Sequence, residues 1–112
     1  MGRKHLGEFE ELVLLFVAVQ AGAAYGVSVM EALAEEAQRS VNISAVHAAL
    51  RRLEKKGFVR SGWSEATNER GGRRRRLFTI TQEGETALIE IRSIRDRLWG
   101  RLPNLGTNLS FS

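Results

Sequence analysis

The chain has 112 residues, of which 43% are hydrophobic and 27% are charged, with one proline and no cysteine. A chain of this length and balance is expected to form one globular domain, without disulfides or thiolate metal sites. The longest apolar run, residues 12–19, is much shorter than the roughly 20 residues that span a bilayer. Since no signal-peptide pattern is present either, we expect a cytoplasmic protein with no membrane partner.

The net charge is +4, and it is unevenly distributed along the chain. Residues 41–81 hold ten Lys or Arg against three Glu, whereas residues 1–40 carry an excess of acids and residues 82–112 are balanced. A localised basic patch is typical of proteins that bind polyanions, although a solvated basic surface would have the same composition.

In chain order, the hydrophobic spacing predicts three helices, a β-hairpin and a last helix. Their expected ranges are residues 8–20, 26–39 and 43–56 for the helices, 58–63 and 77–81 for the strands, and 82–101 for the last helix. Asn42 and Thr81 are suitable N-caps, and Gly22 and Gly57 are suitable stops. The fold class is therefore α+β and mainly helical.

The third helix has two different faces. With Val46 at zero, its apolar residues fall within about 60°, and the opposite face is small, polar or cationic. Small residues permit close approach to a groove floor, and cations reach guanine edges or phosphates. The candidate DNA-binding residues of this helix are Ser44, His47, Ala48, Arg51 and Lys55. An ordinary amphipathic surface helix would show the same separation.

The hairpin tip adds five arginines within seven residues. They are Arg70, Arg73, Arg74, Arg75 and Arg76, with a Gly-Gly pair among them. Such a density of like charge destabilises a fold unless an anion offsets it, so we expect these side chains to contact DNA. A solvated wing or a targeting signal is the alternative. A nucleotide phosphate loop is rejected, because the strand, glycine loop and helix with a terminal Lys-Ser/Thr are missing.

Catalysis and metal binding are poorly supported by the sequence. The chain has two histidines, His5 and His47, and neither has a cysteine or a second histidine at metal-binding spacing. His5 and Glu8 are three residues apart, a spacing that we attribute to chance at the start of the chain. Glu10 and Glu11 do not share a helix face, so they do not form an acid and base pair. We therefore expect no enzyme activity, no metal and no cofactor.

Two terminal helices carry more apolar surface than a small domain is expected to cover. The first is apolar almost all round, and the last has a stripe about 140° wide. Pairing with a second copy would bury both, so we expect a homodimer. The candidate dimerisation residues are Leu12, Leu15, Phe16, Leu88, Ile91, Ile94, Leu98 and Leu102. Trp99 either packs in that interface or lines a pocket for a flat aromatic effector.

At these residues the sequence resembles the PadR family of transcriptional regulators. The resemblance covers about residues 6–102 and is carried by Leu6–Leu15, Ala24–Val27, Ile43–Val59, Arg70–Arg75 and Thr81–Gly84. It implies a winged helix-turn-helix fold, dimerisation through the C-terminal helix, palindromic operators and usually repression, with small aromatic effectors in some relatives. The chain departs from the family at His47, where tyrosine is common, and at Gln82, where proline is common.

The resulting hypothesis divides the chain into three parts. Residues 1–81 form the winged helix-turn-helix DNA-binding domain, residues 82–102 form the C-terminal dimerisation helix, and residues 103–112 form a mobile tail. The function is sequence-specific binding of double-stranded DNA by a homodimeric regulator, a repressor that a small effector releases. The alternatives are a winged helix that binds RNA through its basic wing, or one that binds a protein partner.

Overall fold

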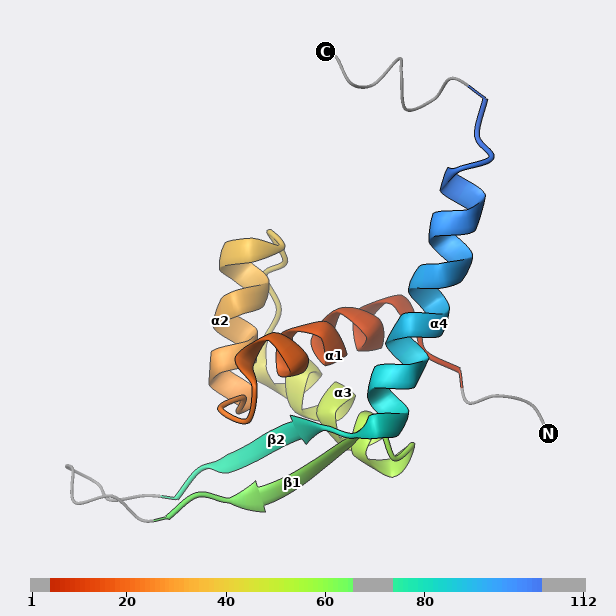
Figure 1. The fold of residues 1–112 in the computed structure, drawn as a ribbon. Coiled ribbons are helices and arrows are strands. Elements are labelled where there is room, and N and C mark those ends of the chain that lie inside the picture. Colours follow the sequence, from red (N-terminus) through yellow and green to blue (C-terminus); the bar gives the residue numbers. More distant parts are fainter. Residues whose placement is uncertain (1–4, 66–73, 104–112) are drawn as a thin grey trace.

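The computed structural model describes residues 5–65 and 74–103. Its elements are α1 (Glu8–Gln20), α2 (Gly26–Glu36), α3 (Ile43–Lys55), β1 (Val59–Trp63), β2 (Arg76–Ile80) and α4 (Gln82–Trp99). Figure 1 shows the first three helices gathered into one body, with the hairpin along one side of it. This order and arrangement confirm the predicted α+β winged-helix fold.

The hydrophobic core lies between the three helices of this body and β2. Its largest fully buried side chains are Val13, Leu14, Val17, Val29, Leu33, Val46, Leu50 and Leu53. All lie at the positions of helical spacing that bring apolar side chains to one face, so burial of this set supplies the main stabilisation of the fold.

Helix α1 is covered within its own subunit to a greater extent than the sequence indicates. Because α2, α3, β2 and α4 all contact it, Phe16 is only 8% exposed and Leu12 packs against the core. Of these two expected dimer contacts, Phe16 is therefore a core residue of the subunit and Leu12 is partly buried against the core. Leu15 remains exposed.

The hairpin is antiparallel, and its register places Val59 opposite Ile80 and Trp63 opposite Arg76. Strand β1 begins at Val59, one residue later than predicted, and strand β2 begins at Arg76, one residue earlier than predicted. An isolated bridge between Ala24 and Phe78 adds the segment before α2 to the free edge of β2. The root of the hairpin is thereby attached to the start of α2.

Helix α2 ends at Glu36, three residues before the predicted end. Gln38 has a left-handed backbone with φ of 51°, and the Arg39 N–H donates to the Leu33 carbonyl. This closing turn normally uses glycine. No glycine follows α2, so the sequence gives no signal for the early end.

Helix α4 begins on the hairpin and then leaves the body. The Thr81 hydroxyl accepts from the Gly84 N–H and donates to the Gly57 carbonyl, which joins the start of α4 to the end of α3. A Cβ on Gly84 would lie 2.3 Å from the Phe58 carbonyl oxygen, so only glycine fits this contact. Figure 1 shows the rest of α4 projecting away from the other helices.

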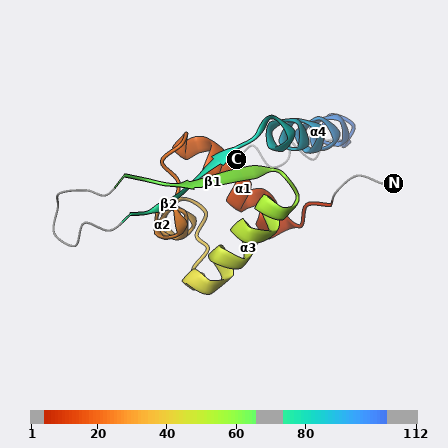
Figure 2. The same cartoon turned by 90° about the horizontal axis from the view of Figure 1, so that it is seen from below.

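In Figure 2, α1 lies between α3 and α4, which therefore occupy opposite sides of the molecule. No helix within the described ranges, 5–65 and 74–103, is long and apolar enough to cross a membrane.

Candidate nucleic-acid interface

Helix α3 presents one face to the core and one to solvent. Its N-terminus is set by Asn42, whose Oδ1 accepts from the Ala45 N–H at 2.9 Å. The predicted inner face is confirmed, because Val46, Ala49, Leu50 and Leu53 are buried. Ser44, His47, Arg51 and Lys55 are exposed, and Ala48 is half-buried between them.

The three cations of α3 and the neighbouring Lys56 fall into two groups. Arg51 and Lys55 have no carboxylate partner within the described residues. Arg52 donates to Glu10 of α1 at 2.6 Å, and Lys56, just beyond the end of α3, bonds the other carboxylate oxygen. Only the first two are therefore available for an external anion.

Glu10 is the anchor behind α3, and sequence reasoning missed it. Glu10 is only 7% exposed, in a helix turn where acids usually face water. Burial raises the pKa of Glu10, but the hydrogen bonds from Lys56 and Arg52 lower it by more, so the carboxylate is ionised well below neutral pH. The ion pairs fix α3 against α1.

The wing places its arginines in different environments. Arg70 and Arg73 lie outside the described residues. Arg74, Arg75 and Arg76 are exposed. Arg76 donates to Ser61 Oγ at 3.0 Å and pairs with Glu54 of α3 at 3.3 Å.

Because Ser61 also donates to Glu54 at 2.7 Å, a polar network joins the wing to the C-terminal half of α3. The positive charge of Arg76 is therefore partly neutralised by Glu54 within the protein.

A notch lies where α2, α3 and the wing meet. It has a volume of about 160 Å³ and is lined by Tyr25, Gly26, Val27, His47, Arg75, Arg76 and Phe78. The guanidinium of Arg75 lies 4.5 Å from the centroid of the Tyr25 ring, a distance that favours cation–π attraction. The sequence gives no spacing signal for Tyr25, because three separate segments build this surface.

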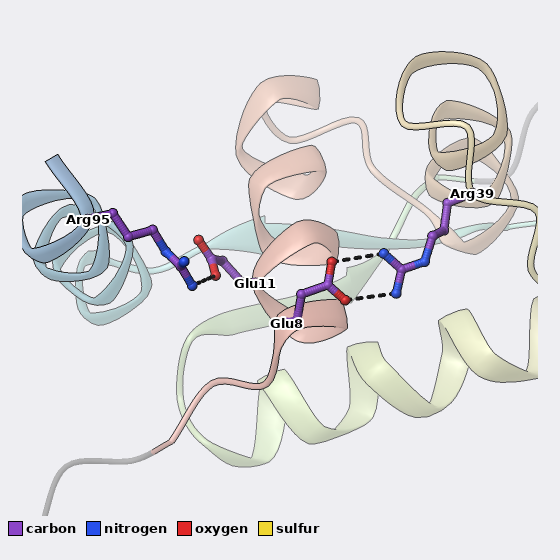
Figure 3. A network of polar contacts seen from close by, with 4 residues as sticks. All are labelled: Glu8, Glu11, Arg39 and Arg95. Atoms are coloured by element: carbon purple, nitrogen blue, oxygen red, sulfur yellow. Dashed lines mark hydrogen bonds and ion pairs between the residues drawn. The ribbon is translucent and has the colours of Figure 1, made fainter. Parts of the chain in front are cut away.

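Two ion pairs hold the outer elements to α1, and Figure 3 shows both. Arg39, in the segment between α2 and α3, makes two hydrogen bonds of 2.8 Å to Glu8, and these lower the pKa of that carboxyl. Arg95 of α4 donates to Glu11 at 3.2 Å. The predicted apolar stripe of α4 therefore includes an arginine that is paired within the subunit.

Helix α4 carries several exposed apolar side chains, most of them in its outer half. They are Ile89, Ile94, Leu98 and Trp99, followed by Leu102 beyond the helix end. Leu88 and Ile91 are half-buried, and Ile91 lines a groove of about 310 Å³ between α4 and the start of α1. The outer half of α4 thus has an apolar surface that the described part of its own chain leaves uncovered.

A family model described as the transcriptional regulator PadR-like family matches residues 14–90. The chain belongs to the PadR-like family. This confirms the resemblance seen in the sequence. Since family members are transcriptional regulators, the expectation that the protein is not an enzyme is also confirmed.

Solved structures of PadR-like proteins share the fold. A PadR-like transcription factor from Bacteroides fragilis is 23% identical, with a TM-score of 0.67 over 80% of this chain and 82% of that one. A PadR family regulator from Eggerthella lenta is 24% identical, with a TM-score of 0.64 over 94% and 88%.

PadR from Bacillus subtilis, solved in complex with operator DNA, is 18% identical with a TM-score of 0.62 over 74% of this chain and 45% of that one. Comparison with curated proteins finds no significant match.

Proposed function

We propose that this PadR-like protein binds double-stranded DNA in a sequence-specific manner, as a homodimer. The observation that carries the proposal is the exposure of Arg51 and Lys55, which have no carboxylate partner in the described part of the chain, on the outer face of α3 beside a basic wing. His47 of α3 and Arg75 of the wing line the same notch, so α3 and the wing present their polar side chains to one side of the molecule. The B. subtilis relative, whose structure contains operator DNA, supports this function.

In the proposed complex, α3 lies in the major groove. Ser44 and Ala48 are small enough for close approach, and His47 and Arg51 reach base edges. Lys55, one turn after Arg51, reaches a phosphate. The buried inner face and the ion pairs with Glu10 hold this helix in a fixed orientation, which lowers the entropic cost of binding.

The wing contacts the flanking backbone. Arg74 and Arg75, together with Arg70 and Arg73 of the same arginine-rich sequence, supply positive charge for phosphates or an adjacent minor groove. Arg76 contributes mainly by fixing the wing to α3, because Glu54 and Ser61 hold its guanidinium.

Dimerisation completes the site. Residues 1–81 form the DNA-binding domain, and residues 82–102 provide the partner surface through Leu88, Ile91, Ile94, Leu98 and Leu102, with Leu15 of α1 at its edge. Two copies related by a two-fold axis place two α3 helices over half-sites about one DNA turn apart, which fits a pseudo-palindromic operator. Occupation of an operator by such a dimer represses transcription.

An effector would act through the same surface. Trp99 is 58% exposed on the outer half of α4, and flat aromatic molecules stack on such a ring. A small aromatic effector bound between two copies would change the distance between the two α3 helices and release the DNA.

Selection of bound fragments from genomic DNA tests the proposal. We expect enrichment of one palindromic motif by the wild-type protein, and loss of the motif with Arg51→Ala while Arg97→Ala, on α4, retains it. Equal recovery of unrelated fragments, or tighter binding of duplex RNA than of any enriched DNA, would contradict sequence-specific DNA recognition.

A further inference from the structure

The notch between α2, α3 and the wing has an unusual set of walls. Its lining includes two aromatic residues, Tyr25 and Phe78, together with Gly26, His47 and Arg75. Phe78 is buried and Tyr25 is half-buried, so two walls belong to the packed body of the protein. The notch is therefore part of the packed fold.

The charge around the notch is positive. None of its seven lining residues is acidic. Arg76 is paired with Glu54, whereas Arg75 has no carboxylate partner in residues 5–65 and 74–103 and stacks on Tyr25. An arginine stacked on an aromatic ring keeps its in-plane N–H donors available, so it remains able to bind an anion.

Gly26 brings the backbone of α2 close to His47 in the notch. A Cβ on Gly26 would lie 2.8 Å from Cε1 and 3.0 Å from Nε2 of His47. The imidazole therefore lies close to the backbone of Gly26, and both residues line the notch together with Arg75.

We propose that this notch seats one backbone phosphate of the bound DNA, an inference that rests on the proposed function. The phosphate accepts hydrogen bonds from the Arg75 guanidinium, the His47 imidazole and the Tyr25 hydroxyl. A DNA strand that leaves the groove occupied by α3 and continues under the wing passes over the notch, because His47 and Arg75 belong to those two elements. The contact fixes the register of the protein along the duplex without reading a base.

The test replaces single phosphates of the selected operator by neutral methylphosphonates, one position at a time. With wild-type protein, we expect one position in each half-site, between the base pairs covered by α3 and those next to the wing, to lower affinity about tenfold or more. With Tyr25→Phe, which keeps the ring under Arg75, affinity for unmodified operator falls and the penalty at that position becomes smaller.

Gly26→Ala is an independent test of the notch, because it adds one methyl group and removes no charge. The methyl displaces His47 and narrows the notch, so affinity falls although the cations remain. Alanine favours a helix more than glycine does, and the thermal midpoint should stay the same or rise, which separates loss of the site from unfolding. Arg75→Gln removes the positive charge of an arginine that lines the notch. Its matched control is Arg60→Gln, which removes one positive charge on the outer face of the hairpin, away from the notch.

The outcomes separate this inference from the proposed function. Failure of the wild type to enrich any operator overturns both. Operator binding that Tyr25→Phe and Gly26→Ala leave unchanged overturns the notch alone. Equal losses for Arg75→Gln and Arg60→Gln, with no position-specific methylphosphonate effect, also overturn the notch, because general electrostatic attraction then accounts for the binding.

Discussion

At the residue scale, neighbouring identical side chains have opposite roles in α3. Arg51 and Arg52 are adjacent, and the 100° step of the helix turns the first to solvent and the second toward Glu10. The sequence predicts the exposed role of Arg51 and Lys55 from the helical wheel. It does not predict the ion pairs of Arg52 and Lys56, because Glu10 lies more than 40 residues away and only the packing of α1 brings it close.

Substitution of Arg51 should affect operator binding, whereas substitution of Arg52 should affect the stability of the fold. Arg51→Ala should weaken operator binding by about 1–3 kcal/mol if the side chain reads a base, with the free energy of unfolding changed by less than about 0.5 kcal/mol. Arg52→Ala should lower the free energy of unfolding by about 1 kcal/mol, since Arg52 is half-exposed. Titration of operator and urea unfolding of both variants check this. A stable Arg52→Ala protein with weak binding would reverse the assignment.

Glu10 should make stability dependent on pH. Its pKa in the folded protein lies below the ordinary value of 4.5, so the unfolded chain binds more protons in that range. The stabilisation is therefore complete above pH 4.5 and is lost as the pH falls through the folded pKa.

Glu10→Gln should cost about 1–3 kcal/mol at pH 7, and the difference from wild type should shrink below pH 4.5. Urea unfolding at several pH values measures it. Glu8→Gln, at an exposed site in the same turn, should have a smaller effect, and a larger effect there would disprove the anchoring role of Glu10.

At the element scale, local signals predicted the elements well and tertiary contacts changed their ends. Asn42 and Thr81 cap the predicted helices because their side chains need only a neighbouring N–H. The early end of α2 depends on a left-handed glutamine, and the extension of β2 to Arg76 depends on pairing with Trp63. Such ends are set by partners that a local pattern does not contain.

The wing should act mainly through charge. Replacement of Arg74 and Arg75 by glutamine should weaken binding to all duplex sequences. The slope of log affinity against log salt should fall in magnitude by about 0.9 for each lost phosphate contact. Binding measured at several salt concentrations checks this, with Arg60→Gln plus Arg97→Gln as the charge-matched control. An unchanged slope with altered sequence preference would mean that the wing reads bases.

At the scale of the whole molecule, part of the apolar surface that the sequence assigns to a dimer partner is buried within the subunit, and part is left exposed. Most of the apolar surface of α1 is covered by its own subunit, since three other helices and β2 contact it, although Leu15 and Val19 remain exposed. The outer half of α4 is not, and exposed apolar patches of this kind mark interaction sites in soluble proteins. The sequence pattern measures how apolar a helix is, but not which neighbours cover it.

Two substitutions on opposite faces of α4 test the dimer. Leu98 is 50% exposed and Ile89 is 65% exposed, and nine residues of helix place them about 180° apart. Leu98→Glu should dissociate the dimer and abolish operator binding, whereas Ile89→Glu should leave both intact. Light scattering at micromolar concentration measures the mass. A wild-type monomer of 12.5 kDa that binds operator tightly would rule out the dimer.

The anchoring of α3 by Glu10 also has a consequence for chemical reactivity. Lys55 and Lys56 are adjacent amines, but Lys56 is held by Glu10 and the His5 carbonyl, whereas Lys55 extends into solvent. An amine-acylating reagent should modify Lys55 first, and Lys56 only after denaturant opens the ion pair. Bound operator should protect Lys55 alone. Peptide mass mapping of the labelled protein would thus report, from two successive residues, the occupancy of the DNA face and the integrity of the fold.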